Sequence, residues 1–197
     1  HLVRWLSFAG VVLLGGLVFV VVCWPAGRDH PRTRRLLWAG WGTTAGAAVL
    51  GVLVEGPYAA GSGLPAARNA DLVRATLSTT YGKMLSARLI ALAFFAVFMQ
   101  RLLADRAARR GDSADPDVDT DRLRAWEEDI AAIAGLAILA TYGGSGHAVT
   151  GSQATVALLS DTVHLCAVVT WLGGLVLLAC CLLPSRRTLE MAAALPR

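Results

Sequence analysis

Long apolar runs constrain this chain more than any other feature of its sequence. The first run covers residues 3–24 and consists almost entirely of Val, Leu, Gly and Phe after Phe8. A helix needs about 20 mostly apolar residues to cross the hydrocarbon core of a bilayer. Four more segments approach this length, at residues 36–54, 84–103, 130–142 and 162–183. The segment at 130–142 is the weakest, because it reaches a spanning length only if it extends back to residue 125 and on towards residue 145.

The composition agrees with a membrane location. Hydrophobic residues make up 55% of the 197 residues and charged residues only 16%, whereas soluble domains carry about 25% charged residues. This excludes a soluble enzyme domain, a disordered chain and a disulfide scaffold. The apolar runs are continuous rather than alternating, which favours spanning helices over strands. We therefore predict one all-α domain over residues 1–197, an integral membrane helical bundle of about five transmembrane helices in the lipid bilayer.

The basic residues predict an orientation. The formal net charge is +4, and 13 of the 18 Lys and Arg residues fall in segments 25–35, 101–129 and the C-terminal tail. Five spans would put these three segments on one side of the membrane. Basic loops stay in the cytoplasm, so the N-terminus is expected outside and the C-terminus in the cytoplasm. We interpret the basic excess as a topology signal and expect no nucleic-acid partner.

Two histidines are the main candidates for chemistry, because motifs of hydrolases, nucleotide-binding loops and zinc proteases are absent. His147 follows the fourth apolar segment, and His164 lies one turn into the fifth. Both are expected at the outer face, where two neutral imidazoles would make part of a site for copper or another borderline metal. An equally weighted interpretation is a solvated His147 and an interfacial His164 that hydrogen-bonds to Asp161 or to a carbonyl oxygen.

Three residues would complete such a site. Asp161 lies three positions before His164, so it shares a helix face with it and would orient the imidazole or bind the metal itself. Trp171 lies seven positions after His164 and would form a wall. His1 is also expected outside, either as a third ligand or merely as the first residue of the chain.

Soft ligands form a second pattern at the opposite side. Cys23 ends the first segment, Cys180 and Cys181 end the fifth, and Met99 lies near the inner end of the third. Thiolate and thioether groups prefer Cu(I), so these residues are candidates for a cytoplasmic release point. The alternative is that they are ordinary buried side chains of spanning helices.

Charge and small residues inside the spans give two more predictions. Arg88 lies about one turn inside the third segment, where a charge is costly unless it is paired, and Glu55 and Asp161 are the candidate partners. Small residues predict close helix packing through the Gly42–Gly46 pair and through glycine doublets at 15–16 and 173–174. Residues 69–81 are expected to form a short amphipathic helix with Asp71 at its N-terminus.

Several sequence blocks resemble the copper resistance protein D (CopD) family. They are Thr79-Thr80-Tyr81-Gly82-Lys83 followed by Arg88, Ser145-Gly146-His147-Ala148, and Asp161-Thr162-Val163-His164-Leu165 leading to Trp171-Leu172-Gly173-Gly174-Leu175. The last two blocks are the most specific. Arg4 and the Trp24-Pro25 exit of the first segment also fit, so the likeness spans nearly the whole chain.

The resemblance implies a copper-handling protein of the bacterial inner membrane that is not an enzyme. Family members take copper from the extracytoplasmic side, commonly for uptake, and several carry a CopC-like copper-binding domain, which makes such a domain or protein an expected partner. The ligand positions that match are His147 and His164, with Asp161, Trp171 and Arg88 as further motif positions. We expect the chain to be the core of a longer protein. Two rival functions stay open, a b-type haem protein using His147 and His164, and a non-catalytic membrane assembly subunit.

Overall fold

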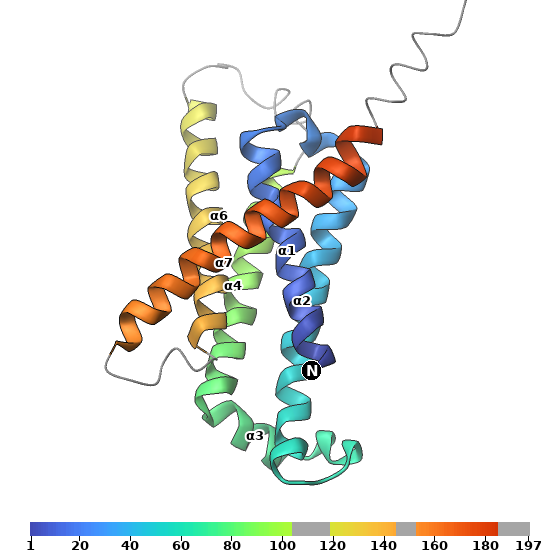
Figure 1. Cartoon of the computed structure of the whole chain (residues 1–197), viewed down its shortest axis with the longest axis vertical. Coiled ribbons are helices and arrows are strands. Elements are labelled where there is room, and N and C mark those ends of the chain that lie inside the picture. Colours follow the sequence, from blue (N-terminus) through green and yellow to red (C-terminus); the bar gives the residue numbers. More distant parts are fainter. Residues whose placement is uncertain (104–118, 145–152, 185–197) are drawn as a thin grey trace, which may run out of the picture.

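The fold is built from helices alone within the part of the chain that the structure, a computed structural model, describes: residues 1–103, 119–144 and 153–184. Five long helices form a bundle (Figure 1): α1 (Leu2–Val22), α2 (Pro31–Ala59), α4 (Thr80–Leu102), α6 (Asp119–Gly144) and α7 (Ala154–Leu177). The shorter elements are the 3-10 helices η1 (Pro25–Asp29) and η2 (Leu64–Arg68), the helix α3 (Ala70–Ser78), and the π-helical turn η4 (Leu178–Leu182), which continues α7.

Four of the long helices are long and apolar enough to cross a membrane: Leu2–Val22, Pro31–Ala59, Thr80–Leu102 and Ala154–Leu182. The predicted helical membrane bundle is confirmed to that extent. The fifth predicted span corresponds to α6, which has 26 residues and packs against α4 and α7. It is less apolar because seven of its first eleven residues are charged.

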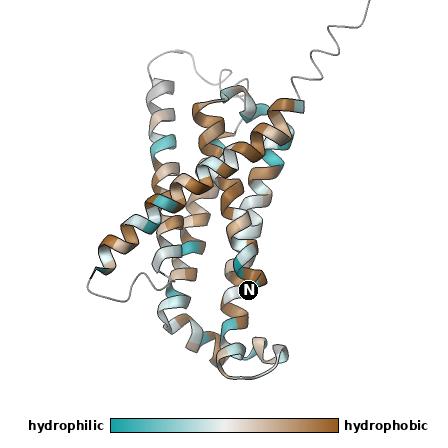
Figure 2. Ribbon diagram, in the orientation of Figure 1, coloured by the Kyte–Doolittle hydropathy of each residue, from teal (hydrophilic) through white to brown (hydrophobic). Residues whose placement is uncertain are grey.

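The connections place the helix ends at two opposite ends of the bundle (Figure 1). We call one the arginine-rich end, defined by Arg28, Arg32, Arg34, Arg35 and Arg101. It holds η1, the start of α2 and of α6, and the ends of α1, α4 and η4 (Figure 1). The other is the α3 end, which holds the end of α2, the start of α4, and α3. Figure 2 shows apolar residues spread along the helices between these ends.

Local capping explains where the helices begin. The backbone N–H of Gly82 donates to the Thr79 side chain at 3.0 Å and starts α4, and the N–H of Asp71 donates to Asn69 at 2.9 Å and starts α3. The predicted short helix at 69–81 is therefore present but ends at Ser78, because the Thr79 cap opens a new helix. α7 begins at Ala154, eight residues before the predicted start, because residues 154–161 contain no Gly or Pro and half of them are Ala or Leu, which favour a helix.

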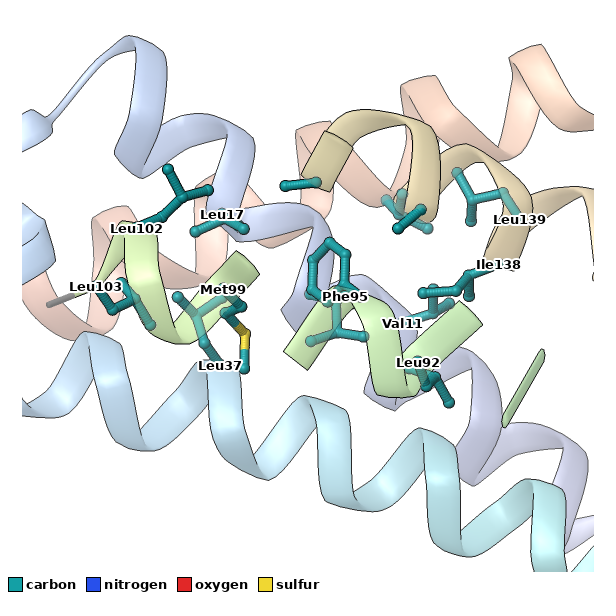
Figure 3. Packing of buried hydrophobic residues seen from close by; sticks show 14 residues of the cluster. Val11, Leu17, Leu37, Leu92, Phe95, Met99, Leu102, Leu103, Ile138 and Leu139 are labelled. Carbon is teal, nitrogen blue, oxygen red and sulfur yellow. The ribbon is translucent and has the colours of Figure 1, made fainter. Parts of the chain in front are cut away.

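The core lies between α1, α2, α4 and α6 (Figure 3). Leu37, Leu92 and Met99 are fully buried there. The indole N–H of Trp41 on α2 donates to the Leu92 carbonyl on α4 at 2.8 Å. Burial of these side chains and this hydrogen bond hold α2 against α4.

Glycines allow two close helix crossings. α7 crosses α1 obliquely (Figure 1), and a Cβ built on Gly15 or Gly173 would collide with the backbone of the other helix, at Val169 and Val12 respectively. Gly10 and Gly40 meet in the same way where α1 packs on α2. The predicted role of the doublets at 15–16 and 173–174 is thus confirmed. The predicted role of Gly42 and Gly46 is wrong, because a Cβ on either would meet no described atom within 4 Å.

Candidate functional site

The α7 candidates lie on the outer surface of the bundle. His164 and Asp161 are both exposed, and Trp171 is 67% exposed. They share one face of α7, as the spacing predicts. His164 lies ten residues after the helix begins at Ala154, which is about 15 Å along the axis, and so lies deeper than the single turn predicted.

The C-terminal end of α6 approaches α7 next to Asp161. A Cβ built on Gly143 would lie 3.7 Å from the Asp161 Cβ. His147 lies outside the described residues, three positions after Gly144. His1 is exposed and precedes α1. Among the described residues no group of three or more His, Cys, Asp or Glu side chains has the geometry of a metal site.

The four soft-ligand candidates lie near the arginine-rich end but do not form one buried group. Cys23 and Cys180 are exposed. Cys181 is fully buried against Val20 and Leu177, whereas Met99 is fully buried in the larger core cluster.

Arg88 forms the most distinctive polar arrangement in the described part of the chain. The residue is only 4% exposed and lies eight residues into α4, about two turns. Its Nε donates to Thr141 Oγ1 at 2.8 Å and its Nη1 to Ser7 Oγ at 3.4 Å. The guanidinium carbon lies 3.6 Å from the centroid of the Tyr142 ring, which is a cation–π contact.

Hydroxyl groups extend this arrangement across three helices. The Tyr142 hydroxyl donates to the Ser7 carbonyl oxygen at 3.0 Å and lies 2.6 Å from Ser7 Oγ, so the Ser7 hydroxyl is left to donate to the Tyr142 oxygen. Thr141 donates to the Ile138 carbonyl at 2.6 Å. We call Ser7, Arg88, Thr141 and Tyr142 the Arg88 cluster, and it joins α1, α4 and α6.

The partners predicted for Arg88 are wrong. Neither the half-buried Glu55 on α2 nor Asp161 on α7 forms an ion pair with it in the described part of the chain. Its partners are neutral hydroxyls and an aromatic face. The sequence contains a signal for two of these partners, because Thr141 and Tyr142 are the only polar side chains in the apolar run 130–142.

Two ion pairs attach α6 to its neighbours at the arginine-rich end. Arg28 Nη2 lies 3.0 Å from Glu128 Oε1, and Arg101 Nη1 lies 3.6 Å from Glu127 Oε1. Arg28 is 5% exposed, and its Nε and Nη1 have no hydrogen-bond partner among the described residues. Glu128 therefore supplies the compensating charge that this buried guanidinium needs.

Comparison of the chain with protein-family models, with curated proteins and with solved structures finds no match in any of the three.

Proposed function

We propose that the protein binds copper at the extracytoplasmic face of the bacterial inner membrane and assists its transport across that membrane. The sequence blocks that resemble the CopD family support this proposal. The structural observation that carries it is the approach of Gly143 to Asp161. It brings the end of α6, from which the segment with His147 departs, to the helix turn of α7 that holds Asp161 and His164.

Chain geometry is compatible with a shared site. His147 is three residues after Gly144, so its Cα lies within about 11 Å of the Gly144 Cα, since each step along the chain spans 3.8 Å. In the proposal, His147 and His164 are the main copper ligands. Asp161 orients His164 or binds the ion, Trp171 lines the site, and His1 is a candidate third ligand. Copper is the substrate here rather than a resident cofactor.

The proposal includes five spans and an orientation. α6 is the fifth span, the arginine-rich end faces the cytoplasm, and the α3 end faces outward. This arrangement follows the rule that Lys and Arg concentrate in cytoplasmic loops. Release of Cu(I) through Cys23, Met99, Cys180 and Cys181 stays a prediction.

The decisive experiment is copper analysis of the purified protein and of cells that express it. The His147→Ala/His164→Ala double variant should lose bound copper and copper accumulation. His30→Ala is the matched control, because His30 lies at the arginine-rich end and caps α2 by accepting from the Arg32 N–H at 3.3 Å. Unchanged copper content in the double variant would refute the proposal, and a Soret band that the double variant lacks would favour the haem alternative.

A further inference from the structure

An apolar cleft lies between α1 and α6. Its volume is about 400 Å³, within the range of ligand-binding pockets. α4 and α7 contribute the rest of the lining, including Phe95 and Val169. Nearly all of the lining side chains are aliphatic or aromatic, and the exceptions that matter are the carboxylates of Glu128 and Asp129.

The cleft has the length of one membrane leaflet. On α1 it extends from Val11 to Val22, and on α6 from Glu128 to Leu139. Eleven residue steps along a helix correspond to about 16 Å, which is about half of the roughly 30 Å hydrocarbon core of a bilayer. On both helices, one end of the cleft therefore lies in the middle of the bundle and the other lies at the arginine-rich end.

The two ends of the cleft differ in polarity. The end in the middle of the bundle is apolar, with Val11 and Leu139 buried beside it. At the arginine-rich end, Glu128 Oε1 lies 3.0 Å from Arg28 Nη2, whereas Asp129 is exposed and forms no ion pair within the described residues. This end of the cleft therefore offers one carboxylate that no described residue pairs and that can meet a cationic group.

We propose that the cleft binds one acyl chain of a phospholipid whose headgroup carries an ammonium group, as in phosphatidylethanolamine. A lipid of the leaflet at the arginine-rich end has the required length, apolar tail and polar end. Its ammonium lies at Asp129. The inference rests on the membrane location of the bundle and is independent of copper binding.

The walls of the cleft favour a thin apolar occupant, because the lining is apolar over almost its whole length. A cleft with walls this apolar also gives water few hydrogen-bond partners. An acyl chain is thin enough to fit and leaves no polar group unpaired.

A substitution on α6 tests the tail. Ala132 lines the cleft and is exposed, whereas Ala137 is exposed on the same helix but does not line it. Delipidated protein would be titrated with phosphatidylethanolamine or phosphatidylglycerol of identical acyl chains, and the bound lipid counted by native mass spectrometry. We expect Ala132→Trp to weaken binding of the first phosphatidylethanolamine at least tenfold and Ala137→Trp to leave it unchanged.

A second substitution tests the headgroup. Asp129→Asn should abolish the preference for phosphatidylethanolamine over phosphatidylglycerol while one lipid still binds, and Asp71→Asn at the α3 end should keep the preference. If Ala132→Trp fails to fold, Gly135→Leu replaces it, because a Cβ at Gly135 meets only the Phe95 ring, at 3.7 Å. The proposal would be overturned if phosphatidylethanolamine bound equally well to wild type and Ala132→Trp, or if both Trp variants lost it equally. It would also be overturned if Ala132→Trp lost a bound quinone or a second copy of the chain rather than a phospholipid.

Discussion

Arg88 shows how a single charged residue is accommodated deep in an apolar bundle. No carboxylate among the described residues pairs with it, and its charge is stabilised by the hydroxyls of Ser7 and Thr141 and by the Tyr142 ring. Ser7 lies on α1, and Thr141 and Tyr142 are consecutive residues of α6, so the guanidinium on α4 also serves as a cross-link between α1, α4 and α6. We therefore expect each substitution around Arg88 to lower the free energy of unfolding by an amount that depends on which of these contacts it removes.

Two substitutions of Tyr142 distinguish the contribution of its hydroxyl from that of its ring. Tyr142→Phe removes the hydrogen bond to the Ser7 carbonyl but keeps the ring beneath Arg88, so we expect the free energy of unfolding to fall by about 1 kcal/mol. Tyr142→Leu also removes the cation–π contact and should cost about 1–2 kcal/mol more. Reversible unfolding in mixed detergent micelles measures both values. Equal losses in the two variants would show that the ring contributes nothing to holding Arg88.

Glu128 should contribute more to the free energy of unfolding than the neighbouring Asp129. Glu128→Gln leaves the buried Arg28 without a compensating charge, and because Glu128 is itself one-third exposed we expect a loss of about 2 kcal/mol, below the range for fully buried pairs. Asp129→Asn is the control, since Asp129 is exposed and has no ion pair among the described residues. The same unfolding assay tests this, and a stable Glu128→Gln variant would contradict it.

At the level of helices, the crossing of α1 and α7 depends on the absence of side chains. Gly15 and Gly173 bring the two backbones into contact, and such close approach lets dispersion forces hold helices together in lipid, where the hydrophobic effect does not. α7 has few other buried residues, namely Val169, Gly174 and Leu177. Its attachment to the bundle is thus concentrated at this crossing.

Alanine substitutions distinguish packing glycines from incidental ones. Gly173→Ala forces α1 and α7 apart and should destabilise the protein by about 1–3 kcal/mol. Gly46→Ala meets empty space and should be neutral or slightly stabilising, because Ala is the better helix former by about 1 kcal/mol. Thermal unfolding of the two variants provides the comparison. A neutral Gly173→Ala would mean that the two helices are free to adjust.

The sequence predicts the helices better than it predicts their contacts. Apolar runs locate the spans because the cost of exposing backbone to lipid makes length and hydropathy decisive. Pairings depend on which faces meet, and a single sequence does not contain that information. Gly42 and Gly46 have the spacing of a packing motif and yet face outward. Arg88 was expected beside carboxylates, but hydroxyls from α1 and α6 reach it first.

For the molecule as a whole, the two ends of the bundle should differ in accessibility. In a background where the four cysteines are replaced by Ala, Ala60→Cys places a thiol near the α3 end and Ala26→Cys near the arginine-rich end, at two exposed positions. If the proposed orientation holds, a membrane-impermeant maleimide labels Ala60→Cys in intact cells and Ala26→Cys only after permeabilisation. The reverse pattern would invert the topology and remove His164 from the outer half.

The Arg88 cluster has a consequence for any ion that moves through this protein. A guanidinium with no carboxylate partner among the described residues sets up a positive electrostatic potential where α1, α4 and α6 meet. A cation 10 Å away is repelled by about 1.7 kcal/mol per unit of charge at an effective dielectric constant of 20. We therefore expect the region around Arg88 to repel cations of either copper oxidation state, as arginine does in water-selective pores. Under the proposed function, we therefore expect a copper ion to avoid the immediate surroundings of Arg88, where α1, α4 and α6 meet.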